Sequence, residues 1–98
     1  MKRAIVLSPD ALRQFRKLRA KDRSRLREAM LASLGEDDAT VEARNRFRLR
    51  RPSEFADFEF RVDDLRVFYR VAVDQVQVVL IGEKKGNHLV IDGKRFTL

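Results

Sequence analysis

The sequence predicts an α+β domain in which two helices precede a small antiparallel sheet. Two observations carry this prediction. Apolar residues recur at helical spacing between residues 9 and 34, and from about residue 40 onward apolar and polar residues alternate. The expected order is β-α-α-β-β-β with a C-terminal hairpin, and the helices are expected to pack on one side of the sheet. With 98 residues, the chain suits one domain, residues 1–98, with a single modest core.

The first third of the chain is expected to hold one strand and both helices. Residues 4–7 form a short apolar run, which predicts a strand. Ser8 is expected to cap the first helix, and Pro9 to occupy its first position, where a missing N–H costs nothing. Asp22 is expected to cap the second helix, and Gly35 is expected to end it.

Residues 40–51 alternate between apolar and polar side chains and predict an extended segment. Arginines occupy every second position, so they are expected to line one edge at a spacing of roughly 6.6–6.8 Å, close to the phosphate step of a nucleic-acid strand. Such a row could follow a nucleic-acid backbone, or it could protect an edge strand from aggregation. The candidate nucleic-acid-binding residues here are Arg44, Arg46, Arg48, Arg50 and Arg51. Pro52-Ser53 is expected to end the segment.

Residues 58–98 are expected to form the main sheet. Phe58–Val62 alternates, Asp63-Asp64 turns the chain, and the next strand places Tyr69 in phase with the apolar core positions. A further strand over residues 75–81 leads to a basic turn. A final hairpin is expected around Asp92-Gly93, because Asp-Gly between apolar runs suits a type I′ turn.

The charge balance points to an anionic partner. The chain has 22 Lys and Arg against 15 Asp and Glu, a net charge of +7, and residues 1–34 alone hold ten basic and three acidic residues. Such an excess fits nucleic acid, a ribonucleoprotein or an acidic binding protein, or it aids solubility alone. The sequence has no cysteine and one histidine, so neither a metal nor another cofactor is expected, and a reducing cytoplasm is the expected location. No apolar run approaches the roughly 20 residues of a membrane span.

The segment from Phe60 to Val71, FRVDDLRVFYRV, resembles the central segment of the RelE/ParE superfamily, the toxins of type II toxin–antitoxin pairs. The order of the predicted elements is similar to that family over nearly the whole chain. The resemblance implies a cognate antitoxin as partner, a small protein whose extended or helical tail covers an apolar groove and offsets the positive charge.

For the branch of that family that cleaves mRNA at the ribosome, the resemblance also implies an active site. RNA is cleaved without metal when its 2′-hydroxyl attacks the adjacent phosphate, and arginines stabilise the resulting dianion. Arg66 matches the family's recurrent active-site arginine. The other candidate catalytic residues are Arg61, Lys84, Lys85, Glu59 and His88. Of these, Glu59 stands where the family carries a lysine, and His88 is the candidate acid. Arg70 is a further candidate for binding RNA.

Several interpretations of these residues stay open. The chain could instead resemble the ParE branch, whose members bind and inhibit DNA gyrase, or an inactive relative that binds only its antitoxin. Glu59 could act as a base or neutralise an arginine, and Arg61 and Arg66 could simply pair with neighbouring carboxylates. Because Arg66 is expected on a solvated strand face, its truncation is expected to cost less than ~1 kcal/mol of stability. If RNA is the target, Lys84, Lys85 and the arginines of 44–50 are expected to form one continuous positive surface with Arg61 and Arg66.

Overall fold

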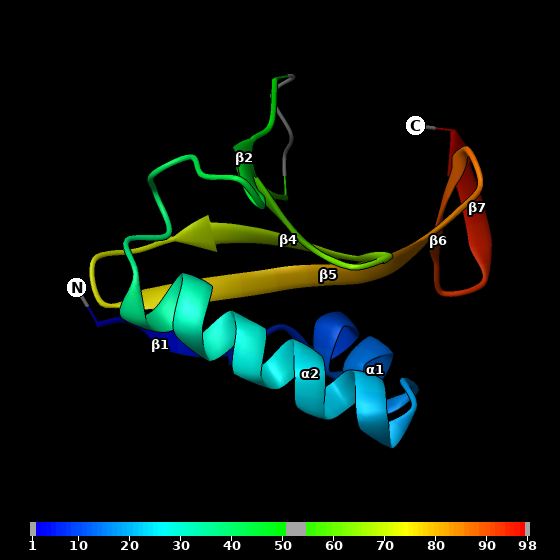
Figure 1. The fold of residues 1–98 in the computed structure, drawn as a ribbon, viewed down its shortest axis with the longest axis horizontal. Coiled ribbons are helices and arrows are strands. Elements are labelled where there is room, and N and C mark those ends of the chain that lie inside the picture. The colour runs from blue at the N-terminus through cyan, green and yellow to red at the C-terminus, as the bar shows by residue number, and fades with distance from the viewer. Residues whose placement is uncertain (1, 51–54, 98) are drawn as a thin grey trace.

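The computed structural model describes residues 2–50 and 55–97. Its helices are α1 (Pro9–Arg16), α2 (Ala20–Met30) and a π-helical continuation, η1 (Leu31–Glu36). Its strands are β1 (Ala4–Leu7), β2 (Arg46–Arg48), β3 (Phe58–Val62), β4 (Leu65–Val71), β5 (Gln75–Lys85), β6 (His88–Ile91) and β7 (Lys94–Thr97). Figure 1 shows both helices on one side of the sheet, while β2 and the β6–β7 hairpin lie toward the other side. The predicted α+β architecture is confirmed.

Strand β5 is the centre of the sheet. The strand order within the described residues is β2-β3-β4-β5-β6-β7, with every neighbouring pair antiparallel. Along its other edge, β5 pairs first with β1 over Gln75–Val78 and then with β6 over Glu83–Lys85. The β1–β5 pair is parallel, so the prediction of a wholly antiparallel sheet is wrong at this one place. Parallel neighbours need a long crossover, and the intervening helices and strands supply it.

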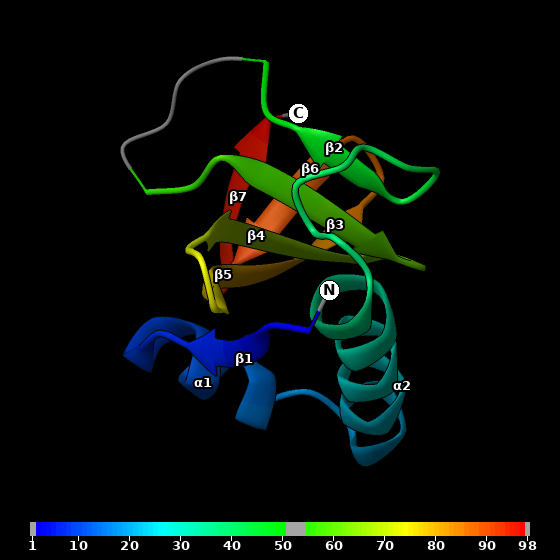
Figure 2. The same cartoon turned by 90° about the vertical axis from the view of Figure 1, so that its left-hand side faces the viewer.

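Helix α1 begins as predicted. Ser8 is the N-cap, its Oγ accepts a hydrogen bond from the Ala11 backbone N–H at 3.0 Å, and Pro9 is the first helical residue. The same hydroxyl donates to the carbonyl oxygen of Val79 at 2.7 Å, which ties the start of α1 to β5. Figure 2 shows β1 next to both helices, at the border of the sheet beyond β5.

Helix α2 differs from the prediction at both ends. It begins at Ala20 with Arg19 as N-cap, so Asp22 lies inside the first turn and does not cap the helix. Gly35 does not end the helical segment, which continues as η1 to Glu36. The physical role of this glycine is close approach: a Cβ on Gly35 would lie 3.3 Å from the carbonyl oxygen of Arg3, and the Arg3 N–H donates to the Gly35 carbonyl at 2.9 Å.

The predicted extended segment over residues 40–51 is largely wrong. Of its described residues, only Arg46–Arg48 forms a strand, and the preceding residues form turns. Arg46 is the reason, because its side chain is buried against the end of the helical segment. Its Nη1 donates to the carbonyl oxygen of Ser33 at 2.6 Å, and its Nε donates to that of Val41 at 3.1 Å. Arg51 and the Pro52-Ser53 break lie outside the described residues.

The helix-facing side of the sheet carries the main core. Tyr69 is fully buried in it, as predicted; its ring stacks on Phe58 with centroids 5.2 Å apart, and its hydroxyl donates to the Ala39 carbonyl at 2.8 Å. The sheet residues of this core are Phe58, Phe60, Leu65, Val67, Tyr69, Val76, Val78 and Ile81, and the helical ones include Ala11, Leu26, Met30 and Leu34. A smaller apolar cluster of Ala56, Phe68 and Leu89 lies on the opposite side of the sheet.

Candidate functional site

Two arginines face each other across β3 and β4 on the side of the sheet away from the helices. Arg61 and Arg66 are Cα partners in the antiparallel register. They alternate with core residues of the same strands, so both side chains belong to the opposite face. Like charges in directly opposed positions destabilise a strand pair unless a counter-charge or a bound anion offsets them. Glu59 forms an ion pair with Arg61, which is one of the two roles that the sequence left open for this carboxylate.

Arg66 is buried, with 8% of its surface exposed. Its Nη1 donates to the carbonyl oxygen of Asp63 at 2.8 Å and to that of Leu65 at 3.0 Å. The expectation that Arg66 lies on a solvated face is therefore wrong. The guanidinium satisfies backbone carbonyls of the β3–β4 turn, and the neighbouring strand is closely covered: a Cβ on Gly82, the β5 partner of Arg66, would lie 2.8 Å from Ile91 Cγ1.

Lys84 and Lys85 are separated by the alternation of β5. Lys84 lies two residues beyond Gly82 and opposite Leu89, so it belongs to the face of Arg66. Its backbone N–H also donates to the Asp64 carbonyl at 2.7 Å, at the β3–β4 turn. Lys85 instead lines a cavity on the helix-facing side, together with Gln14 and Leu18 of the helical region. We call Arg61, Arg66 and Lys84 the basic triad; Lys85 is not part of it.

His88 is also on the other side of the sheet. It pairs with Lys85 in β6, and therefore shares the face of Lys85 and not that of Arg66. The ring is half-buried, and its Nδ1 is buried without a hydrogen-bond partner among the residues that the structure describes. The predicted meeting of His88 with Arg66 is wrong, because the β5–β6 turn sets a register that the sequence did not reveal.

The arginines of residues 44–50 do not form a uniform row. Arg46 is turned inward, and its Nη1 also lies 3.3 Å from an Asp37 carboxylate oxygen. Arg48 is exposed and its guanidinium lies over the Phe58 ring, 4.6 Å from the centroid. Arg44 and Arg50 are exposed, so the predicted continuous positive surface is interrupted at Arg46. Arg70 is half-buried on the strand face of Arg66, where other contacts engage it.

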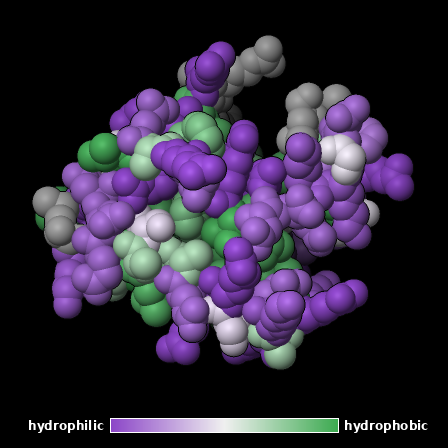
Figure 3. Space-filling model, viewed as in Figure 1, coloured by the Kyte–Doolittle hydropathy of each residue, from purple (hydrophilic) through white to green (hydrophobic). Residues whose placement is uncertain are grey.

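Two hollows meet at one aromatic side chain, Phe47 of β2. The larger, about 830 Å³, lies between α2 and the β2–β3 edge, and the smaller, about 520 Å³, lies along β2. Phe47 and Arg61 line both, and the Arg61 guanidinium lies over the Phe47 ring at 4.5 Å from its centroid. Seen from the same direction as in Figure 1, the molecule has apolar surface in the middle of the face shown, surrounded by hydrophilic side chains (Figure 3). Sequence reasoning missed this pair, because nothing in the spacing of residues 47 and 61 signals a contact.

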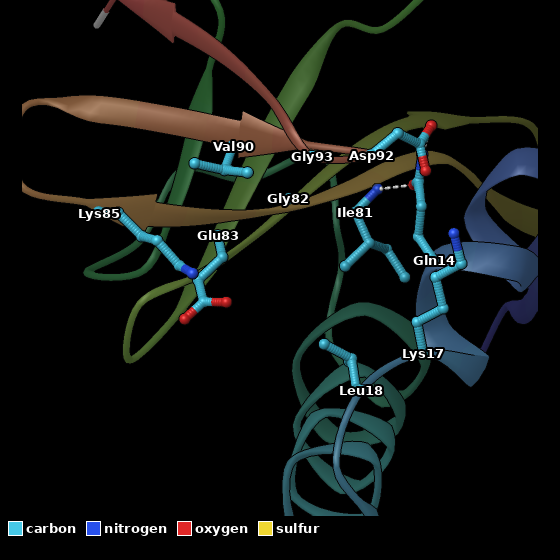
Figure 4. A pocket seen from close by; sticks show the side chains of 10 residues that line it. All are labelled: Gln14, Lys17, Leu18, Ile81, Gly82, Glu83, Lys85, Val90, Asp92 and Gly93. Atoms are coloured by element: carbon cyan, nitrogen blue, oxygen red, sulfur yellow. Dashed lines mark hydrogen bonds between the residues drawn. The ribbon is translucent and has the colours of Figure 1, made fainter.

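A third cavity, of about 220 Å³, lies between α1 and the β6–β7 hairpin (Figure 4). Gln14 is buried here; its Nε2 donates to Asp92 Oδ2 at 3.0 Å, and its Oε1 accepts from the Ile81 backbone N–H at 2.6 Å. Arg13 Nη2 donates to the same Asp92 oxygen at 2.8 Å. The Gln14 hydrogen bond and the Arg13 contacts lower the pKa of the Asp92 carboxyl, against the opposing effect of burial. These contacts fasten the hairpin to α1.

The basic triad can bind an anion, and the described residues give it few groups for proton transfer. Glu59, a carboxylate that adjoins the triad, is engaged with Arg61. Nowhere in residues 2–50 and 55–97 do three or more His, Cys, Asp or Glu side chains gather as metal ligands would. In the same ranges, no helix is long and apolar enough to cross a membrane. Comparison with protein-family models gives no match, and neither does comparison with curated proteins.

Proposed function

We propose that this protein is the toxin of a type II toxin–antitoxin pair with a RelE/ParE-like fold, and that it cleaves mRNA at the ribosome in the cytoplasm without a metal. The observation that carries the proposal is the direct opposition of Arg61 and Arg66 on the sheet face that the helices leave open, with Lys84 beside them. Two arginines at paired strand positions favour a doubly charged anion bound beside them, and the transition state of phosphodiester cleavage is such an anion.

The hydrogen bonds of Arg66 would hold its positive charge in place before a substrate binds. Its Nη1 is held by the Asp63 and Leu65 carbonyls, and in the described part of the chain its other N–H groups have no partner. A guanidinium fixed in this way needs little reorganisation when charge develops on the phosphate. Arg61 would contribute its terminal nitrogens, since Glu59 is paired with its Nε. Glu59 is the nearest candidate to accept the 2′-hydroxyl proton once RNA competes for Arg61.

The test is controlled expression of the chain without its antitoxin, followed by mapping of mRNA 5′ ends. We expect new ends in ribosome-bound mRNA, and we expect Arg66→Ala and Lys84→Ala to abolish them. The matched control is Arg27→Ala, which removes an exposed arginine from α2. Arrested growth with an unchanged pattern of mRNA ends would contradict the proposal, as would equal loss of cleavage in the control.

A second candidate is a ParE-like toxin that binds DNA gyrase and cuts nothing. One observation favours it: Lys85 and His88 share the opposite face of the sheet, and Glu59 is engaged with Arg61, so three of the predicted catalytic groups do not stand ready beside Arg66. Measuring plasmid supercoiling in the same cells separates the two. Loss of gyrase-dependent supercoiling without new mRNA ends would favour gyrase binding. If neither the plasmid supercoiling nor the pattern of mRNA ends changes while an antitoxin still binds, the chain is the inactive relative.

A further inference from the structure

Phe47 and Arg61 together form a wall between two hollows. The guanidinium lies over the ring at 4.5 Å, and the two side chains line the hollow beside α2 as well as the hollow along β2. Phe47 is only half-buried. It lies on the strand face opposite the main core, since its β3 partner is Glu59. An aromatic ring that is fixed by one arginine and borders two open spaces is a suitable surface for stacking.

Both hollows carry an excess of positive charge. The larger is lined by three arginines and two carboxylates: Arg25, Arg44, Arg61, Glu28 and Asp63. The smaller is likewise lined by three arginines and two carboxylates: Arg48, Arg50, Arg61, Glu42 and Glu59. In each hollow one carboxylate is paired with an arginine, Asp63 with Arg25 and Glu59 with Arg61. Arg44 and Arg50 form no ion pair in the described ranges, and they stand on opposite sides of Phe47.

This combination fits single-stranded nucleic acid. Proteins hold single strands by stacking bases on aromatic rings and guanidinium planes, while neighbouring cations follow the phosphates. A duplex keeps its bases stacked on each other, so it offers none to such a wall. The larger hollow also contains the side chains of Asn45 and Ser33, whose polar groups suit the edge of an unpaired base.

We propose that the Phe47–Arg61 wall is a nucleobase-stacking platform, and that a single RNA strand runs through the two hollows on either side of it. The strand would place one base against Phe47, with Arg44 on one flank and Arg48 and Arg50 on the other. Because Arg61 is the direct partner of Arg66, the stacked base lies next to the phosphate held by the basic triad. The choice of RNA as ligand rests on the proposed function; the stacking surface itself does not.

The experiment measures binding of the intact protein to a short single-stranded RNA whose 2′-hydroxyls are methylated, so that cleavage cannot interfere. A 2-aminopurine base in the probe reports stacking through its fluorescence, and the matched duplex is the competitor. We expect Phe47→Leu, which keeps apolar volume and removes the ring, to weaken binding roughly tenfold and to abolish the fluorescence change. Phe47→Tyr should bind as the parent does. Phe96→Ala, at an exposed aromatic on β7, is the control and should change nothing.

The outcomes separate this inference from the proposed function. If Phe47→Leu binds the single strand as tightly as the parent, or if the duplex competes equally well, the platform is wrong even when the protein cleaves mRNA. If the parent protein stacks the probe base and Phe47→Leu does not, the platform stands even when no cleavage or toxicity is found. Thermal unfolding of both Phe47 variants shows whether the fold is intact, and the Tyr variant keeps the test valid if Leu is poorly tolerated.

Discussion

The two faces of the sheet come from the same strands and differ in what covers them. On the helix-facing side, Val67, Tyr69, Val76 and Val78 have no exposed surface, because α1, α2 and η1 close over them. On the other side a small apolar cluster adjoins arginines, one hollow lies along β2, and a second lies at the β2–β3 edge beside α2. The helices therefore cover one face, and the second face is covered only in part. Stability is expected to depend chiefly on the first face and function on the second.

The arginines of this protein divide in a similar way. Arg46 and Arg66 are buried and donate to backbone carbonyls, Arg46 at η1 and Arg66 at the β3–β4 turn. Arg44 and Arg50 are exposed on the segments that border the hollows. Residue type alone does not show which arginines serve the fold; the contacts of each guanidinium do, and for Arg66 we propose a role in the site as well.

The largest expected effect is the loss of a core side chain on the helix-facing side. Phe60 is 2% exposed, and Phe60→Ala should lower the free energy of unfolding by about 3–5 kcal/mol, through lost burial and the cavity left behind. Urea denaturation measures it. Phe96→Ala is the matched control, since Phe96 is 49% exposed, and it should cost less than ~1 kcal/mol. Equal losses would mean that the two faces do not differ as described.

The next effect is alkaline destabilisation through Tyr69. Burial is the main cause that raises the pKa of Tyr69 to about 12. The folded state therefore holds this proton more tightly than the unfolded state, whose tyrosine ionises near pH 10. Its stabilising contribution is complete below pH 10 and is lost as the pH rises toward 12, in total on the order of 2 kcal/mol.

The check is urea denaturation of the parent protein and of Tyr69→Phe between pH 8 and pH 12. The parent should lose stability more steeply than the variant over the upper part of this range. Tyr69 is the one tyrosine of the chain, so tyrosinate absorbance follows its titration directly. Parallel curves for the two proteins would refute the assignment.

Truncation of Arg66 should lower the free energy of unfolding by less than the loss of a core side chain does. The loss should still exceed the one expected for an arginine on a solvated strand face. Arg66→Ala leaves the Asp63 and Leu65 carbonyls without their donor, and we expect a loss of about 1–3 kcal/mol. Arg61→Ala removes an exposed ion pair and should cost less than ~1 kcal/mol. Thermal or urea unfolding of both variants tests this order, and the reverse order would contradict the assigned burial.

The smallest predicted effect concerns the cap that positions the covering helix. Ser8→Ala removes the hydrogen bond to the Ala11 N–H and the one to Val79, and should cost about 1 kcal/mol. Ser24→Ala, at an exposed position inside α2, is the control and should stay within roughly 0.5 kcal/mol of the parent. A neutral Ser8 variant would show that the cap adds nothing to the closure of the helix-facing side.

Local patterns predicted those parts of the fold that local forces decide. The Ser8-Pro9 helix start is confirmed, and so is the Asp92-Gly93 turn, where φ is 53° and 77° as a type I′ turn requires. Alternation correctly predicted β3, β4 and the start of β5, but β5 continues to Lys85 through residues that were expected to form the basic turn. Over residues 40–50 alternation predicted correctly only Arg46–Arg48, and Arg46 itself is fixed by the carbonyl of Ser33, a residue distant in the sequence.

The candidate site was less predictable for a related reason. Alternation places Arg61 and Arg66 on one face, and the sequence did bring them together as candidates. It could not reveal that β5 continues to Lys85, which places this lysine on the other face, or the β5–β6 register, which places His88 there as well. Nor could it reveal the contact between Phe47 and Arg61, which depends on the pairing of β2 with β3. Pairings between segments remote in the chain decide which candidates meet.

The double pairing of β5 has a consequence for synthesis on the ribosome. Residues 4–7 at the start of the chain find their strand partner only in residues 75–78, and the same strand supplies the edge for β6. The nascent N-terminal third therefore has no sheet to pack against until nearly the whole chain has been made, and contacts this remote in sequence form slowly. We expect a nascent chain that stops at residue 71 to be fully sensitive to protease, and one that extends to residue 98, released from the exit tunnel, to be protected. The protein would thus acquire its structure in one late step.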